Sequence, residues 1–172
     1  QIIKELLIHH RLRIPTWDLH IGFGSDIVTT LHYYVIGDPL NLCAAFVPVR
    51  YTEYLYDFLC FFRYYLAGIT FSWYCFYNKN EKIPVLLGSL IYVYSQWMIV
   101  TGLDHPYFIN PCIYLPLIML GADKIFDKKK PWTYIGALTL AGISNFYFFY
   151  MLGIFTVIYA VFRYFTKFKG FR

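Results

Sequence analysis

The stretch WTYIGALTLAGISNFYFFYMLGIFTVIYAVFRYF, residues 132–165, contains only one charged side chain. As a single helix it would be roughly 50 Å long at about 1.5 Å per residue, whereas the hydrocarbon core of a bilayer is only about 30 Å thick. Gly142 and Asn145 interrupt its first half. We therefore predict two membrane-embedded helices here, over 132–143 and 146–164.

The composition of the whole chain is typical of a membrane protein. Of its 172 residues, 59% are hydrophobic, 23% aromatic and 15% charged, whereas soluble domains usually carry about 25% charged residues. A soluble core of this size could not bury 18 Tyr, 17 Phe and 4 Trp side chains, but membrane interfaces accommodate Tyr and Trp well. The net charge of +5 does not indicate nucleic-acid binding, because no basic stripe with interleaved aromatic residues lies outside the apolar segments.

Three more apolar segments are long enough, or nearly long enough, to cross a bilayer. They cover residues 54–77, 85–101 and 108–122, and a spanning helix needs about 20 residues. The third contains Pro111 and Pro116, which membrane helices tolerate when neighbouring groups satisfy the freed carbonyls. We predict an all-α polytopic membrane protein, a bundle of about five transmembrane helices.

The basic residues predict the orientation of these helices. NKNEK (78–82), DKIFDKKK (123–130) and RYFTKFKGFR (163–172) each follow a predicted span, and short loops rich in Lys and Arg stay cytoplasmic. Five crossings place all three stretches on that side, while a single span over 132–164 would place the last one outside. The extracytoplasmic face then holds seven of the ten acids and all five histidines, the groups that could carry out chemistry.

The chain divides into two parts. We expect residues 1–53 to form an extracytoplasmic loop with interfacial and juxtamembrane helices, and residues 54–172 to form the transmembrane bundle. The region 15–50 is too interrupted by Gly and Pro to span and too apolar to stay in water, so short helices lying in the interface fit it best. Both ends look like cuts through a longer protein. The four cysteines form no C-x-x-C pair, and we predict neither a metal site nor a disulfide from them.

The segment WDLHIGFGSD (17–26) is the first candidate for a chemical site. Asp18 and Asp26 flank a Gly-x-Gly bend, with His20 between them. A carboxylate there could act as general base on a hydroxyl group, or hold a divalent ion together with phosphate oxygens. The alternative is structural, because both aspartates could instead cap short interfacial helices.

The LDHP segment (103–106) is the second candidate. Asp104 and His105 lie at the outer end of a predicted span, where they could face the 17–26 loop across a cavity or cap the next helix. A similar pattern, Asp38 followed by Pro39, is typical of turns and helix starts, and we interpret it as structural.

Arginines provide the candidate phosphate contacts. Arg63 is the one charge well inside a predicted span. It could extend to the outer interface, pair with Asp57, or bind a lipid phosphate. Arg50, Glu53 and Asp57 are separated by three and four residues, so they share one helix face near the outer surface.

Four segments of the chain resemble the YfhO family of bacterial membrane proteins. They are IPTWDLHIGFGSDIVTTLHYYVIGDPLNL (14–42), RYYLAGITFSWY (63–74), HPYFINPCIYLPLIMLGADKI (105–125) and NFYFFYMLGIFTVIYAVFRYF (145–165). The resemblance covers nearly the whole chain and implies the amino-terminal portion of such a protein. It also implies similarity to GT-C membrane glycosyltransferases, which transfer a sugar from a polyprenyl-phosphate donor on the extracytoplasmic side, here to a cell-wall polymer such as teichoic acid.

The resemblance also implies a location, partners and residue roles. The location is the bacterial plasma membrane, crossed several times with the basic loops cytoplasmic, and the partners are the lipid-linked donor, the polymer acceptor and membrane lipid. In GT-C enzymes a carboxylate in the first outer loop is the catalytic base or a metal ligand, so a divalent metal ion is the one cofactor left open. In this family the acidic motif usually lies just after the first span, which would fall before Gln1. The candidate residues are, for catalysis, Asp18, Asp26, Asp104 and His105, and, for the phosphate or lipid headgroup, Arg50, Arg63 and His20.

Two other functions remain open at this point. One is a lipid-linked sugar transporter or flippase, and the other is a non-catalytic membrane partner in cell-envelope assembly. A transporter is expected to show charged residues near the bilayer midplane and repeated halves, and the sequence shows neither. As a fragment of an enzyme, the chain alone is expected to be inactive.

Overall fold

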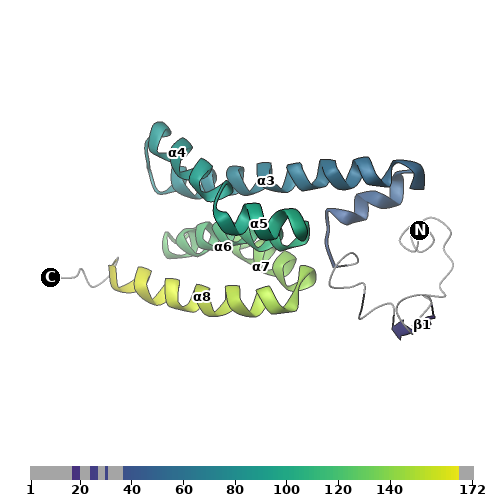
Figure 1. The fold of residues 1–172 in the computed structure, drawn as a ribbon. Helices are drawn as coiled ribbons and strands as arrows, with labels where there is room; N and C mark the ends of the chain where they lie inside the picture. The colour runs from purple at the N-terminus through teal and green to yellow at the C-terminus, as the bar shows by residue number, and fades with distance from the viewer. Residues whose placement is uncertain (1–16, 20–23, 27–29, 31–36, 167–172) are drawn as a thin grey trace.

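The protein is a bundle of helices that lie lengthwise beside one another (Figure 1). The computed structural model describes residues 17–19, 24–26, 30 and 37–166. Within these residues the α-helices are α3 (Thr52–Tyr77), α4 (Lys82–Val93), α5 (Gln96–Asp104), α6 (Asn110–Phe126), α7 (Trp132–Ser144) and α8 (Phe146–Tyr164). Short 3-10 helices precede α3 and α6, namely η2 (Asn41–Phe46), η3 (Val49–Tyr51) and η4 (Pro106–Ile109). The prediction of a mostly helical membrane protein is confirmed.

Helix α6 is the centre of the bundle. It packs against α3, α7 and α8. In the most apolar segment of η4 and α6, 61% is buried inside the protein, whereas the figure for the corresponding segment of α8 is 11%. The buried apolar cluster that includes α6 draws on all six α-helices and on η4, and its members are Ala67, Val93, Met98, Ile109, Ile113, Tyr114, Ile118, Ala137, Ala141 and Leu152. The remaining large apolar side chains of α8 and α4 are mostly exposed, as expected for helices that face lipid.

Helices α6 and α7 approach each other closely at Gly121. A Cβ added to this glycine would lie 2.5 Å from both the Cα and the backbone N of Tyr134. Ala137 and Ala141, one and two turns further along α7, are buried as well. Small residues at this spacing let helix backbones approach closely in membranes, where packing and hydrogen bonds provide most of the attraction.

We predict that Gly121→Ala destabilises the protein, because the clash is with backbone atoms that cannot rotate away. The expected cost is about 1–3 kcal/mol, measured as a lower unfolding temperature in detergent. Gly136→Ala is the matched control, since a Cβ there meets nothing within 4 Å. Equal unfolding temperatures for the two variants would contradict the close approach.

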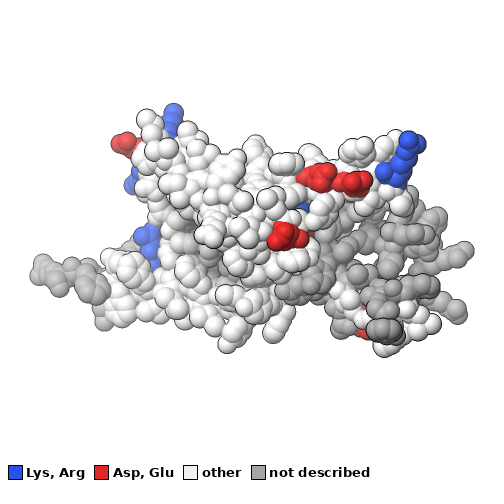
Figure 2. All heavy atoms as spheres, in the orientation of Figure 1, with Lys and Arg blue, Asp and Glu red and all other residues white. Residues whose placement is uncertain are grey.

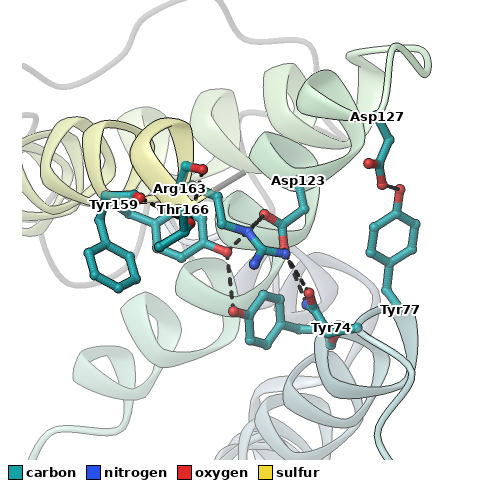
Figure 3. A network of polar contacts seen from close by, with 9 residues as sticks. Tyr74, Tyr77, Asp123, Asp127, Tyr159, Arg163 and Thr166 are labelled. Carbon is teal, nitrogen blue, oxygen red and sulfur yellow. Dashed lines mark hydrogen bonds and ion pairs between the residues drawn. The ribbon is translucent and has the colours of Figure 1, made fainter. Parts of the chain in front are cut away.

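A polar cluster joins the ends of α3, α6 and α8 (Figure 3). Asp123 is 2% exposed, and its carboxylate accepts hydrogen bonds from Arg163 Nε at 2.7 Å, Tyr159 Oη at 2.9 Å and Asn78 Nδ2 at 3.2 Å. Arg163 also donates to Asn78 Oδ1 at 2.6 Å. These bonds hold the 78–82 loop, the 123–130 loop and the end of α8 at one end of the bundle, which we call the basic end.

Loss of the Asp123 carboxylate should destabilise the bundle at the basic end. Asp123→Asn removes the counter-charge of Arg163, and we expect it to cost roughly 1–3 kcal/mol, near the lower limit because Arg163 is 35% exposed. Asp127→Asn removes an equal charge from an exposed position in the same loop, and it should lower the unfolding temperature much less. A larger effect of Asp127→Asn would show that the Asp123 contacts do not support the fold.

The prediction of about five spans is only partly supported by length and composition. Within the described residues, Pro106–Phe126 and Phe146–Tyr164 are long and apolar enough to cross a membrane, and α4 with α5 is a third candidate if the two form one span. Helix α7 has 13 residues, or about 20 Å. The structure therefore supports two or three candidate spans on these criteria.

Two local predictions differ from the structure. The span predicted over 85–101 is broken, because Ser95 has an extended ψ of 152° and α4 meets α5 at 44°. Short helices were expected over 15–50, and η2 lies there, but Trp17–Asp18 (β1) and Ser25–Asp26 (β2) pair as antiparallel strands. The turn between them needs Gly24, which has a φ of +104°. By contrast, the predicted break before 146–164 is confirmed, since Asn145 Oδ1 caps α8 by accepting from the N–H of Phe148.

Candidate functional site

A buried arginine cluster lies at the other end of the bundle. Arg63 on α3 is 2% exposed, as is Asp38, and Arg63 Nη2 donates to Asp38 Oδ2 at 2.5 Å. The same nitrogen donates to Asn41 Oδ1 at 3.0 Å, and Arg63 Nε donates to Asn110 Oδ1 at 3.1 Å. We call Asp38, Asn41, Arg63 and Asn110 the Arg63 cluster.

The local sequence explains how Asp38 reaches Arg63. In GDPLN (37–41), Asp38 Oδ1 accepts from the N–H of Leu40 at 3.0 Å, and the carbonyl of Asp38 accepts from the N–H of Asn41 at 3.1 Å. This aspartate turn leads into η2 and leaves the second carboxylate oxygen for the guanidinium. The turn that we interpreted as structural therefore also supplies the counter-charge of Arg63.

Asn110 sets the depth of the cluster in the bundle. It is the first residue of α6, so its hydrogen bond places Arg63 level with the start of that helix rather than at its middle. The first turns of α3 extend beyond this level, as Figure 1 shows. Asn110 is 1% exposed, and its Nδ2 has no hydrogen-bond partner among the described residues. A buried donor of this kind can bind a water molecule or a ligand.

A small cavity adjoins the cluster. Its volume is about 250 Å³, below the roughly 300–1,000 Å³ of sites that take drug-sized ligands. Among the described residues, Arg63 is the one charged residue in its wall, and the others are a mixture of polar and apolar residues. The lining residues are Asn41, Ala44, Thr52, Leu55, Tyr56, Leu59, Arg63, Pro106 and Tyr107. The cavity can therefore hold a small group beside the buried Asp38–Arg63 ion pair.

The LDHP segment lies next to this cavity. Asp104 ends α5, and both Asp104 and His105 are exposed. His105 Nδ1 is 3.0 Å from the hydroxyl of Tyr107, which lines the cavity. The structure thus brings the segment to the mouth of the Arg63 cavity through Tyr107.

Of the two candidate arginines, Arg63 lines the cavity and Arg50 does not. Arg63 pairs with Asp38, so the suggested pairing with Asp57 and the suggested extension to the outer interface were wrong. Arg50 is exposed, with its guanidinium carbon 6.0 Å from the ring centre of Tyr51.

The hairpin candidates are only partly described. Asp18 pairs with Ser25 and Trp17 with Asp26 in the ladder, and the hairpin lies at the end of the molecule where α3 begins (Figure 1). Asp26 is half-buried. His20 and the side chain of Asp18 lie outside the described residues. Within the described ranges, no three His, Cys, Asp or Glu side chains gather to hold a metal ion.

Charged side chains gather toward the two ends. The face seen in Figure 2 carries acidic side chains over the first half of α3, a basic group at the start of that helix, and both basic and acidic groups near the tip of α4. A wide uncharged region lies between them. This is the pattern of a protein whose middle contacts lipid and whose ends contact water.

Sequence reasoning missed the partners of Arg63. Asp38, Asn41 and Asn110 lie 25, 22 and 47 positions from it, so no spacing rule connects them. A usable signal was the isolated Asn110 within an apolar run, because buried polar groups near a membrane need partners.

Comparison with known proteins identifies the family. The family model described as "Bacterial membrane protein YfhO" matches residues 4–172. The chain belongs to the YfhO family. It is also 30% identical over 164 residues to "Uncharacterized protein YfhO" of Bacillus subtilis (strain 168), an alignment that covers 88% of this chain. This YfhO-family chain spans about a fifth of that relative's length, 19%. No solved structure matches the chain.

We predict that the Asp38–Arg63 pair holds the 37–41 turn on the bundle. Asp38→Asn leaves a buried guanidinium without its counter-charge and should cost about 3–5 kcal/mol. The double variant Asp38→Asn/Arg63→Gln removes both formal charges and should cost less than the sum of the single variants. Unfolding temperatures give the three values, with Asp57→Asn as an exposed control. Additive effects would contradict a direct pairing.

Proposed function

We propose that this chain is the membrane part of a GT-C-type glycosyltransferase that takes a sugar from a polyprenyl-phosphate donor. The acceptor in this proposal is a cell-wall polymer such as teichoic acid. The observation that carries the proposal is the Arg63 cavity, which adjoins the buried Asp38–Arg63 ion pair at the end of the bundle opposite the basic end. The resemblance of the family to GT-C enzymes adds support, and the activity is proposed for the full-length protein.

The proposed topology has five crossings, made by α3, by α4 with α5, and by α6, α7 and α8. Hydrogen bonds at Asp123 hold the described parts of the three basic stretches at one end, and the positive-inside tendency favours the cytoplasm for that end. The Arg63 cavity then opens on the extracytoplasmic side of the plasma membrane. A lipid-linked sugar presents its phosphate and sugar at this depth.

The proposed chemistry is a nucleophilic displacement at the anomeric carbon of the sugar. A carboxylate removes the proton from the acceptor hydroxyl, the hydroxyl oxygen forms the new glycosidic bond, and the bond from the anomeric carbon to the phosphate oxygen breaks. The candidates for the base are Asp104, which precedes the cavity-lining Pro106 by two positions, and Asp18 and Asp26 on the paired strands.

The departing lipid phosphate gains negative charge, and a cation held in a water-poor site stabilises such charge more strongly than one in water. Arg63 is the first candidate for this role because it lines the cavity. His105 and Arg50 are exposed near the same end, and His20, the remaining candidate, lies outside the described residues. The cavity volume suits a phosphate group rather than a whole lipid-linked sugar.

The test is sugar transfer by the full-length protein in membranes that contain a polyprenyl-phosphate sugar and a polymer acceptor. If one of the three aspartates is the base, its Asn variant should lose on the order of 10²–10⁴-fold in rate. Asp57→Asn, an exposed acid on α3, is the matched control and should retain activity.

The other outcomes are also informative. Full activity in all three variants would remove these carboxylates from the chemistry and point to an acid elsewhere in the full-length protein. Movement of the lipid-linked sugar across the membrane without transfer would favour a transporter or flippase. Absence of both activities, in protein that folds, would favour a non-catalytic partner in envelope assembly. The last two results would each overturn the proposal.

A further inference from the structure

Two aromatic rings on the last turns of α3 each carry a lysine ammonium. Lys124 Nζ lies 4.9 Å from the ring centre of Trp73, and Lys129 Nζ lies 4.6 Å from that of Tyr77. Trp73 and Tyr77 are four residues apart, so they share one face of the helix. The two ammonium groups therefore lie over neighbouring rings at the basic end of the bundle.

These two ammonium groups retain unused hydrogen-bonding capacity. Among the described residues, neither forms an ion pair with a carboxylate. Lys124 donates to Thr133 Oγ1 at 3.0 Å, which uses one of its three N–H groups. The nearest acids are engaged elsewhere, since Asp123 holds Arg163 and Asp127 accepts from the hydroxyl of Tyr77 at 2.6 Å. An anionic oxygen ligand would complement this pair of charges.

An apolar groove includes the same tryptophan, Trp73, in its wall. It lies between α3 and α4, has a volume of about 680 Å³, and is lined on α3 from Phe61 to Phe76 and on α4 from Leu86 to Tyr94. The α3 side is about 22 Å long at helical rise, somewhat more than the roughly 15 Å of one leaflet's hydrocarbon. Trp73 is 49% exposed, and it belongs both to the groove and to the Lys124 contact.

We propose that this surface, made of Lys124, Lys129, Trp73, Tyr77 and the α3–α4 groove, binds a phospholipid with an anionic headgroup. The phosphate region contacts the two ammonium groups, and one acyl chain lies along the groove. The charge favours an anionic lipid over a zwitterionic one, because a zwitterionic head brings its own cation to a surface that is already positive. This inference does not depend on the proposed sugar transfer, which concerns the opposite end of the bundle.

The experiment measures quenching of Trp73 fluorescence by lipids with brominated acyl chains. Full-length protein is reconstituted in phosphatidylcholine vesicles that contain equal mole fractions of brominated phosphatidylglycerol or brominated phosphatidylcholine. The contribution of Trp73 is the difference between the protein and its Trp73→Phe variant. We expect stronger quenching by the phosphatidylglycerol, and a preference that weakens as salt is added, because screening reduces interactions between charges at a surface.

Two double variants test the role of the lysines. Lys124→Gln/Lys129→Gln should reduce the preference for phosphatidylglycerol by roughly fivefold per lysine. Lys79→Gln/Lys82→Gln is the matched control, because it removes the same charge from exposed positions at the same end and should leave the preference unchanged. Lys124→Arg/Lys129→Arg keeps the charges and should restore the preference, which separates lipid binding from a loss of fold.

Three results would overturn the proposal. Equal quenching by the two lipids would show that the headgroup is not selected. No quenching by either would show that protein, such as a further helix or a second copy, covers the groove. Equal loss of preference in the two Gln variants would assign the effect to the general charge of this end.

Discussion

Helix α6 carries a buried polar side chain at each end, and the arrangement of the bundle depends on this pair. At its start Asn110 accepts from Arg63, and near its end Asp123 accepts from Arg163. A polar group removed from water must find a partner within the protein, and the cost of failing to do so is several times the net gain of an ordinary hydrogen bond. Each end of α6 therefore selects which neighbour lies beside it and at which height.

Between the two polar contacts, α6 and α7 pack closely through small apolar residues. Gly121 lets the backbone of α7 approach α6, and the alanines of α7 continue the contact. Packing of this kind determines how close two helices lie, but small residues repeated along a helix leave its axial position less well defined. Hydrogen bonds from side chains at known heights remove that freedom, because they are lost if a helix slides by one turn.

The need of buried polar groups for partners also gives the two ends of the bundle different charge environments. At one end Arg63 is neutralised by Asp38 and borders a small cavity, so its charge is held where water is scarce. At the basic end the acids are engaged by Arg163 and by tyrosine hydroxyls, and Lys124 and Lys129 remain over aromatic rings. The two proposals follow this difference, since we assign transient contact with a small anion to the first arrangement and lasting contact with a membrane surface to the second.

The sequence by itself determined where helices form and which segments avoid water, because apolar length and capping residues act locally. Residues 146–164 were predicted as a helix and are α8, and Asn145 caps it as its position before an apolar run suggests. The break at Ser95 and the hairpin over Trp17–Asp26 were not predicted, since neither has a strong local signal. Only the tertiary structure decided that Arg63 pairs with Asp38 and Asn110, and that Asp123 pairs with Arg163. These partners lie 25 to 47 positions apart in the chain, and the need to satisfy a buried charge specifies that a partner exists without specifying which one.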